Sequence, residues 1–501
     1  MTQDPHDADA LAQTSVQVSG TRSRWMWILA GVLTALLGVL IVVQVLKPDP
    51  LGSQAQPSGP EGTQTPQSPS QSPSPDPTSD SKPSGEPGQI YSWGAPVYLD
   101  FVVDSAAAPP VNDSEIKEQP RLALGLSGIT SIQRALSGGI ALTDQGTVMA
   151  WGMSLDEVLG QRREIEESHT PVQIPGLADV KSIHTLVSTG VALLNDGTVT
   201  TWGSNKNGAL GAGITDPGLV LSPLVQVEGL ANVAQIVLGN GSVYAVLDDG
   251  SVWAWGSNKY GLLGAGLESE FEVAPVQVKG LTDVQTIETG LNSAFALKKD
   301  GTVAGWGSNF EGVLGPDFDG RNSTVPVMIT GVQDARSVAV TYQGAYAVLK
   351  DNAVIGWDNK SRDLFGGGAG PVKIPGLTNI QEIVSGYANN AYAINQDGTV
   401  FAWGDNDLGL NGNGQTQGTQ SQPAKIDGLA NVKSMAVCYT KAYAVLDNNT
   451  VMTWGSQRLF DLTGGPERPD IAVPIVEPAL LDIDRIVCDD VLAYAITAGD
   501  G

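Results

Sequence analysis

The distribution of apolar and polar residues divides the chain into three kinds of sequence. Residues 25–46 form one apolar run without a charged side chain. A helix of that length is about 33 Å long, enough to cross the ~30 Å hydrocarbon core of a bilayer. Residues 47–87 show no hydrophobic period, whereas short strand-like runs recur from residue 88 onward. The pattern predicts a transmembrane helix, a linker and a repeated β domain over residues 88–501.

The charges that flank the apolar run indicate its orientation. Arg22 and Arg24 precede the run, and Lys47 alone follows it. The positive-inside rule then places residues 1–24, which we expect to be a disordered tail, in the cytoplasm and the β domain outside. A cleavable signal peptide is the alternative, but its apolar region is usually ~7–15 residues long. The longer run favours a single-pass anchor in the cell membrane.

The linker over residues 47–87 is rich in proline and serine. It carries eleven prolines among Ser, Gln, Gly and Thr. Such a composition favours extended polyproline II structure over a packed core. We expect a disordered spacer that holds the β domain away from the membrane.

Four sequence features recur through residues 88–501 at intervals of about 51 residues, a period typical of propellers and solenoids. They are Trp-Gly, a proline, Gly-Leu before an apolar pair, and Asp-Gly. The repeated tryptophans are Trp93, Trp151, Trp202, Trp255, Trp306, Trp357, Trp403 and Trp454. The prolines are Pro120, Pro171, Pro223, Pro275, Pro326, Pro371, Pro423 and Pro474.

Each repeat reads as four short strands. In residues 192–203, ALLNDGTVTTWG, Asp-Gly supplies the tight turn of a hairpin. The Gly-Leu segment and the segment around the proline can supply two further strands. The domain opens with the second half of a hairpin, residues 88–94, and ends with the first half, residues 493–501. Pairing these ends would close an all-β propeller of eight four-stranded blades.

The combination Trp-Gly-Ser-Asn, Gly-x-Leu-Gly and Pro-x-x-Val, clearest in residues 249–281 and 300–332, resembles the regulator-of-chromosome-condensation repeat family. The resemblance covers residues 88–501 and implies a closed propeller, usually of seven blades. Seven blades is therefore the alternative to eight, with the shortened unit around Trp357-Asp358 as the incomplete one. The family's founder activates a small GTPase and binds chromatin.

Composition argues against nucleic acid as a partner. The chain has 27 basic and 53 acidic residues and a formal net charge of −26. Phosphate-binding surfaces need clustered Lys and Arg. Only three histidines are present and no common catalytic motif occurs. We therefore expect no enzyme, no cofactor and no metal site.

The two cysteines occupy nearly equivalent positions in successive repeats. Repeat geometry would place Cys438 and Cys488 on adjacent inner strands. A disulfide is one interpretation, since such bonds persist outside the cytoplasm. Two buried, unbonded small side chains are the other.

The segments between Trp-Gly and the proline differ most among the repeats, and we expect them to gather on one face. Exposed aromatic and charged residues there are candidate partner anchors. The candidates are Tyr98, Phe101, Glu157, Arg162, Arg163, Glu270, Phe271, Phe318 and Arg321. They predict a non-enzymatic scaffold that binds an extracytoplasmic protein or peptide. Recognition of cell-wall glycan is one alternative, and GTPase exchange or chromatin binding is another.

Overall fold

The computed structural model describes residues 88–94, 120–123, 126–135, 138–153, 167–186, 188–214, 221–309, 312–341, 344–358, 370–386, 389–456, 470–488 and 492–498. Every described residue belongs to one compact unit, Ser81–Gly501. The predicted tail, anchor and linker lie outside the described residues. No helix in the described part is long and apolar enough to span a membrane.

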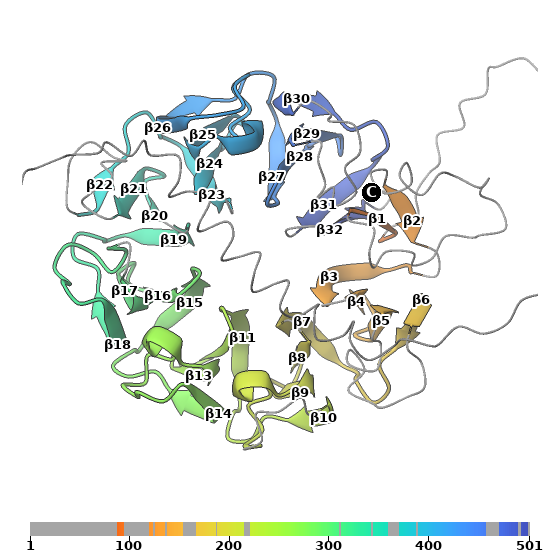
Figure 1. Cartoon of the computed structure of the whole chain (residues 1–501), viewed down its shortest axis with the longest axis vertical. Helices are drawn as coiled ribbons and strands as arrows, with labels where there is room; N and C mark the ends of the chain where they lie inside the picture. The colour runs from red at the N-terminus through yellow and green to blue at the C-terminus, as the bar shows by residue number, and fades with distance from the viewer. Residues whose placement is uncertain are drawn as a thin grey trace, which may run out of the picture. The chain divides into compact units, whose positions relative to one another are not determined.

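The described residues form eight antiparallel sheets of four strands (Figure 1). In seven of them, the strands follow chain order from the inner to the outer position. The inner strands are β3 (Ile129–Ala135), β7 (Val180–Leu186), β11 (Val233–Leu238), β15 (Val284–Thr289), β19 (Ala335–Val340), β23 (Ile380–Ser385), β27 (Val432–Val437) and β31 (Ile483–Cys488). The second strands are β4 (Gly138–Thr143), β8 (Thr189–Leu194), β12 (Ser242–Leu247), β16 (Ser293–Lys298), β20 (Gly344–Leu349), β24 (Asn390–Asn395), β28 (Lys441–Leu446) and β32 (Leu492–Thr497).

The third strands carry the repeated tryptophans. They are β5 (Val148–Met153), β9 (Val199–Ser204), β13 (Val252–Ser257), β17 (Val303–Ser308), β21 (Val354–Asp358), β25 (Val400–Asp405), β29 (Val451–Gly455) and β1 (Ile90–Gly94). The outer strands are β6 (Glu167–Gln173), β10 (Leu221–Gln226), β14 (Phe271–Gln277), β18 (Asn322–Met328), β22 (Val372–Lys373), β26 (Thr419–Lys425), β30 (Ile471–Val476) and β2 (Arg121–Ala123). Three short 3₁₀ turns follow third strands: η2 (Lys206–Gly208), η3 (Lys259–Gly261) and η4 (Asp407–Gly409).

The predicted hairpin is the centre of each blade. Residues 192–203 fall in β8 and β9, and Gly197 at their turn has a φ of +79°. The Asp196 carboxylate accepts hydrogen bonds from the backbone N–H and the hydroxyl of Thr198, which fixes the turn. Second strands such as β12 are buried at five successive positions because both of their faces pack against neighbouring blades. This explains why they read as continuous apolar runs rather than alternating ones.

The two ends of the described chain close the ring. β1 pairs with β32 over five residues, from Ile90 opposite Ile496 to Gly94 opposite Leu492. The seam blade therefore takes β1 and β2 from the N-terminal side and β31 and β32 from the C-terminal end. Each inner strand contacts the next one from β3 to β31, and β3 also contacts β32. Eight blades are thus confirmed and the seven-bladed alternative is wrong, because β21 and the short β22 complete the unit around Trp357.

The repeated proline lies in or immediately before the outer strand. Pro275 and Pro326, for example, lie within β14 and β18. An outer strand has only one partner strand, so a missing N–H costs no ladder hydrogen bond there. Proline also blunts the exposed edge against pairing with other chains.

A disulfide joins the seam blade to its neighbour. Cys438, just after β27, is bonded to Cys488 at the end of β31, and their Cα atoms are 5.5 Å apart. In the structure the pair joins adjacent inner strands, which agrees with the disulfide interpretation and not with two unbonded side chains. The bond fastens the C-terminal half of the seam sheet to the ring independently of β1.

Replacing both cysteines by serine should lower the free energy of unfolding by about 2–4 kcal/mol, because the 50-residue loop closed by the bond gains freedom in the unfolded chain. Urea denaturation followed by tryptophan fluorescence measures the loss. A reductant should produce the same loss in the unaltered chain and none in the Cys438→Ser/Cys488→Ser variant. Two free thiols in the unreduced, denatured protein would contradict the bond.

Candidate functional site

The contact between successive blades is built on a buried tryptophan. Seven of the repeated tryptophans, from Trp151 to Trp454, are at most 1 % exposed, and Trp93 is 5 % exposed. Six of these rings meet an aromatic side chain of the preceding blade edge to face, as Trp306 meets Tyr244 with centroids 6.1 Å apart. A buried indole N–H needs an acceptor, because leaving it unpaired costs about 1–3 kcal/mol.

In four blades that acceptor is a backbone carbonyl of the preceding blade. Each carbonyl belongs to the short segment between two glycines that follows Trp-Gly in the repeat. The bonds run from Trp255 Nε1 to Ala209 O at 3.0 Å, Trp306 Nε1 to Leu262 O at 2.7 Å, Trp357 Nε1 to Val313 O at 2.9 Å, and Trp454 Nε1 to Leu410 O at 2.7 Å. The loop after one third strand therefore anchors the next blade.

A buried asparagine holds each of these loops in shape. Asn258 accepts a hydrogen bond from the N–H of Leu263 at 3.0 Å and donates to the carbonyls of Leu267 and Ser269. The equivalent residues are Asn205, Asn309 and Asn406, which accept from Leu210, Leu314 and Asn411 and donate to carbonyls further along their loops. One side chain thus ties both ends of the loop together.

In two blades whose preceding repeat lacks this asparagine motif, a tyrosine hydroxyl accepts the indole N–H. Trp403 donates to Tyr346 Oη at 3.2 Å, and Trp93 donates to Tyr443 Oη at 2.9 Å. The preceding repeats read Trp357-Asp358-Asn359 and Trp454-Gly455-Ser456-Gln457 instead of Trp-Gly-Ser-Asn. The interblade hydrogen bond therefore persists while its acceptor changes.

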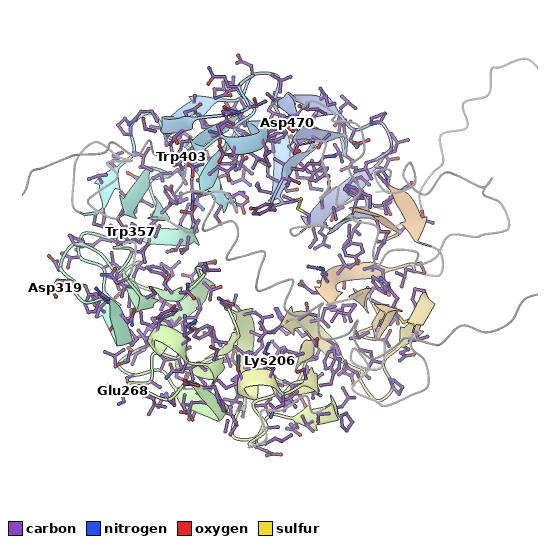
Figure 2. All side chains as sticks on the ribbon, in the orientation of Figure 1. Lys206, Glu268, Asp319, Trp357, Trp403 and Asp470 are labelled. Carbon is purple, nitrogen blue, oxygen red and sulfur yellow. A yellow bond between two sulfur atoms is a disulfide. The ribbon has the colours of Figure 1, made fainter. Side chains whose placement is uncertain are left out.

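The described loops lie at one end of the blades, which we call the loop face. The register pairs Ser242 with Gly256, so the turn before β12 and the loop after β13 lie at the same end. The glycine is required there, because a Cβ on Gly256 would lie 2.5 Å from the Gly241 carbonyl oxygen. The N–H of Gly266 reaches sideways to Thr324 O in the next blade at 2.7 Å. Lys206, Glu268 and Asp319 lie on three of these loops (Figure 2).

Four of the candidate anchors fall within the described residues. Glu270 and Arg321 are exposed on the loop face, and Phe271 is half-buried at the start of β14. Phe318 is also half-buried, but its ring packs against the hydrophobic cluster that contains Trp357. Its packing therefore serves the core. The other five candidates, Tyr98, Phe101, Glu157, Arg162 and Arg163, lie outside the described residues.

No catalytic constellation is visible in the described part of the chain. Burial raises the pKa of Glu288 to about 7, and burial lowers the pKa of His184 to about 4. These two side chains lie on β15 and β7, the inner strands of different blades, so neither supplies an acid–base partner to the other. The described residues contain no group of three or more His, Cys, Asp or Glu side chains that could hold a metal ion.

Sequence reasoning identified the loops but missed the asparagine and tyrosine that position them. The asparagine had a visible signal, since Ser-Asn or Asp-Asn follows Trp-Gly in the four units with an anchored loop. The tyrosine had none, because Tyr346 and Tyr244 occupy the same place in their repeats and only the structure separates their roles.

Tyr346→Phe should lower the free energy of unfolding by about 1–3 kcal/mol, because it removes the acceptor of the Trp403 indole N–H. Tyr244→Phe is the matched control, since Trp306 keeps the Leu262 carbonyl. We expect the control to lose about 1 kcal/mol or less. Denaturant unfolding of the two variants measures the difference, and equal losses would contradict the proposed exchange of acceptors.

Comparison with known proteins identifies the repeat. Residues 196–246 and 249–297 match the regulator of chromosome condensation (RCC1) repeat, and a second model of that repeat matches residues 233–262. The ultraviolet-B receptor UVR8 of Arabidopsis thaliana is 27% identical over 358 residues, covering 68% of this chain and 78% of UVR8. The human E3 ubiquitin-protein ligase HERC2 is 27% identical over 376 residues, covering 71% of this chain. The alignment spans only 8% of HERC2's length.

The same fold occurs in Prp20p from Saccharomyces cerevisiae. Its crystal structure superposes with a TM-score of 0.56 at 22% identity, covering 83% of this chain and 92% of Prp20p. At 22% identity, this similarity shows that the two chains share a fold and nothing more. Together with the matched repeats, it confirms the resemblance read from the Trp-Gly units. Residues 196–246 and 249–297 match RCC1 repeats, and the described residues build a closed ring of eight blades.

Proposed function

We propose that this propeller is a non-enzymatic scaffold that binds a protein or peptide on its loop face outside the cell membrane. The observation that carries the proposal is the hydrogen-bonded loop network. It supports exposed, repeat-specific side chains such as Glu270 and Arg321 on a rigid ring. Rigid presentation lowers the entropic cost of binding. Protein recognition also has a precedent in the fold, since Prp20p has been described with Gsp1p, histones and Kap60.

The disulfide supports an extracytoplasmic position. Both cysteines of the chain are bonded to each other, and bonds of this kind are rare in a reducing cytosol. The apolar run at residues 25–46 and the arginines before it would display the ring on the same side. Two independent features therefore favour the same compartment.

The alternatives have weaker support. Residues 88–501 hold 45 of the 53 acidic residues and 23 of the 27 basic ones, and such an acidic domain does not suit a phosphate backbone. Glycan binding would need exposed aromatic platforms. Trp253, the one tryptophan outside the repeat slots and residues 25–46, is half-buried against a hydrophobic cluster.

Cysteine labelling in intact cells tests the compartment. A membrane-impermeant maleimide should label Ser70→Cys in the linker without lysis, because the two native cysteines are bonded. Ser15→Cys in the N-terminal tail is the matched control and should react only after lysis. Labelling of Ser70→Cys only after lysis would reject the extracytoplasmic position.

Site-specific photocrosslinking tests the binding face. A photoreactive phenylalanine at position 268, exposed on the loop face, should form a protein adduct in intact cells. The same group at position 351, in the exposed turn at the opposite end of a blade, should form none. Equal adducts at both positions would argue against the loop face. An adduct removed by wall-degrading enzymes but resistant to protease would favour glycan recognition instead.

A further inference from the structure

One exposed aromatic side chain on the loop face has a strained backbone. Tyr260, in the middle of η3, has a φ of +65° and is 39 % exposed. Bulky side chains are disfavoured in this left-handed region, because Cβ comes too close to the following carbonyl oxygen. The equivalent residue of η2 is Asn207, with a φ of +56°, and asparagine tolerates the region better than most residues. The chain therefore carries a tyrosine where an asparagine would cost less.

The strained φ is imposed by the residues around Tyr260. The Gly261 N–H donates to the Asn258 carbonyl at 2.9 Å and closes the turn. A Cβ on Gly261 would lie 2.7 Å from Thr324 Cα, so this glycine packs directly on β18 of the next blade. The Leu262 carbonyl that follows accepts the indole N–H of that blade. Residue 260 therefore stays in the left-handed region whatever its side chain.

Neither the loop nor the core accounts for the ring of Tyr260. η2 makes the same turn with Asn207, and its loop also presents a carbonyl to the next tryptophan. The ring does not seal the neighbouring strand either, since η3 contacts β18 and Val325 on that strand is still 36 % exposed. Phe318 on the next loop, by contrast, packs against a hydrophobic cluster. A strained residue whose side chain serves no internal contact is typical of a functional site.

The loop that carries Tyr260 is acidic. Its charged residues are Lys259, Glu268, Glu270 and Glu272 (Figure 2 labels Glu268). The Asn258 N–H donates to the Glu270 carbonyl at 2.8 Å, which brings the acidic end of the loop back beside its start. Lys259 Nζ lies 5.2 Å from the centre of the Tyr260 ring, within the range of a cation–π contact. The ring face is therefore already a place where a cationic group rests.

We propose that Tyr260 is a recognition residue of the loop face and that it receives an arginine or lysine side chain of the bound protein. The inference rests on the function proposed above and adds to it a residue and a partner chemistry. A ring face beside carboxylates attracts a cation both through the ring quadrupole and through charge complementarity. Tyrosine is also enriched among the residues that dominate binding energy. The 45 acidic and 23 basic residues of 88–501 would attract a basic segment at longer range.

Thermal unfolding of the full chain in detergent separates recognition from packing. Tyr260→Asn relieves the strained φ with the residue that η2 uses, so the unfolding midpoint should rise by about 2 °C. Tyr260→Leu is the matched control, because η4 has Leu408 at this position with a φ of +68°, and it should not raise the midpoint. A lower midpoint for Tyr260→Asn would show that the ring serves the fold and would overturn the proposal.

Photocrosslinking in intact cells tests recognition with the same variants. The probe is a photoreactive phenylalanine at position 268. Tyr260→Asn and Tyr260→Leu should each lower the yield of the protein adduct about tenfold, as expected for the loss of a dominant contact. Tyr260→Phe keeps the ring face and should keep the adduct. Equal yields in all four chains would overturn the role of Tyr260 and leave the loop face as the binding surface, whereas no adduct in the unaltered chain would reject the loop face and this inference with it.

Charge reversal tests the chemistry of the partner. Glu270→Lys places a cation on the loop of Tyr260 and should lower the adduct yield, because it repels a basic side chain. Glu228→Lys makes the same change of net charge at an exposed site beyond β10, at the opposite end of a blade, and should leave the yield unchanged. An unchanged yield with Glu270→Lys, or an equal loss with both variants, would overturn the basic partner.

Discussion

The packing of the buried tryptophans against the preceding blade, with an indole hydrogen bond to that blade at six of them, is the constraint on which the ring depends. A large indole fills the gap between two sheets, but its N–H cannot be left unpaired there. The repeat meets both demands at once, because the residues after one Trp-Gly supply the carbonyl that receives the next tryptophan. The same few residues therefore determine both the packing of one blade on the next and the conformation of the loop.

The conformation of the loop face follows from this hydrogen bond. A loop that must present a carbonyl at a fixed point needs internal support, which the asparagine of Ser-Asn provides through both ends of its amide. Side chains elsewhere on the loop are then free to vary without loosening the ring. This division of labour explains how one architecture presents a different set of exposed residues on each blade, as a recognition surface requires.

Much of the fold could be predicted because its signals are local and repeated. Strand pairs, the Asp-Gly turns and the outer prolines follow from patterns within about 51 residues, and the closure of β1 on β32 follows because the two ends of the repeated region are complementary halves of one hairpin. The residues of the candidate site were harder to predict from the sequence. Phe318 lies among polar residues, as an exposed anchor would, yet it packs against the hydrophobic cluster that contains Trp357. Only its neighbours in three dimensions distinguish these two roles. Whether Trp403 donates to a loop carbonyl or to the Tyr346 hydroxyl likewise depends on the loop of another repeat.

Departures from a repeat are informative when they share a location. Where the repeat departs from Ser-Asn after Trp357 and Trp454, Tyr346 and Tyr443 supply the lost acceptor, so the next tryptophan keeps its hydrogen bond. Asn411 does the opposite, because Trp454 already has the Leu410 carbonyl and the buried amide adds an unmet demand. Local rules are broken in this way mainly where a site is built. The buried amide of Asn411 is therefore a departure that the packing of Trp454 does not require.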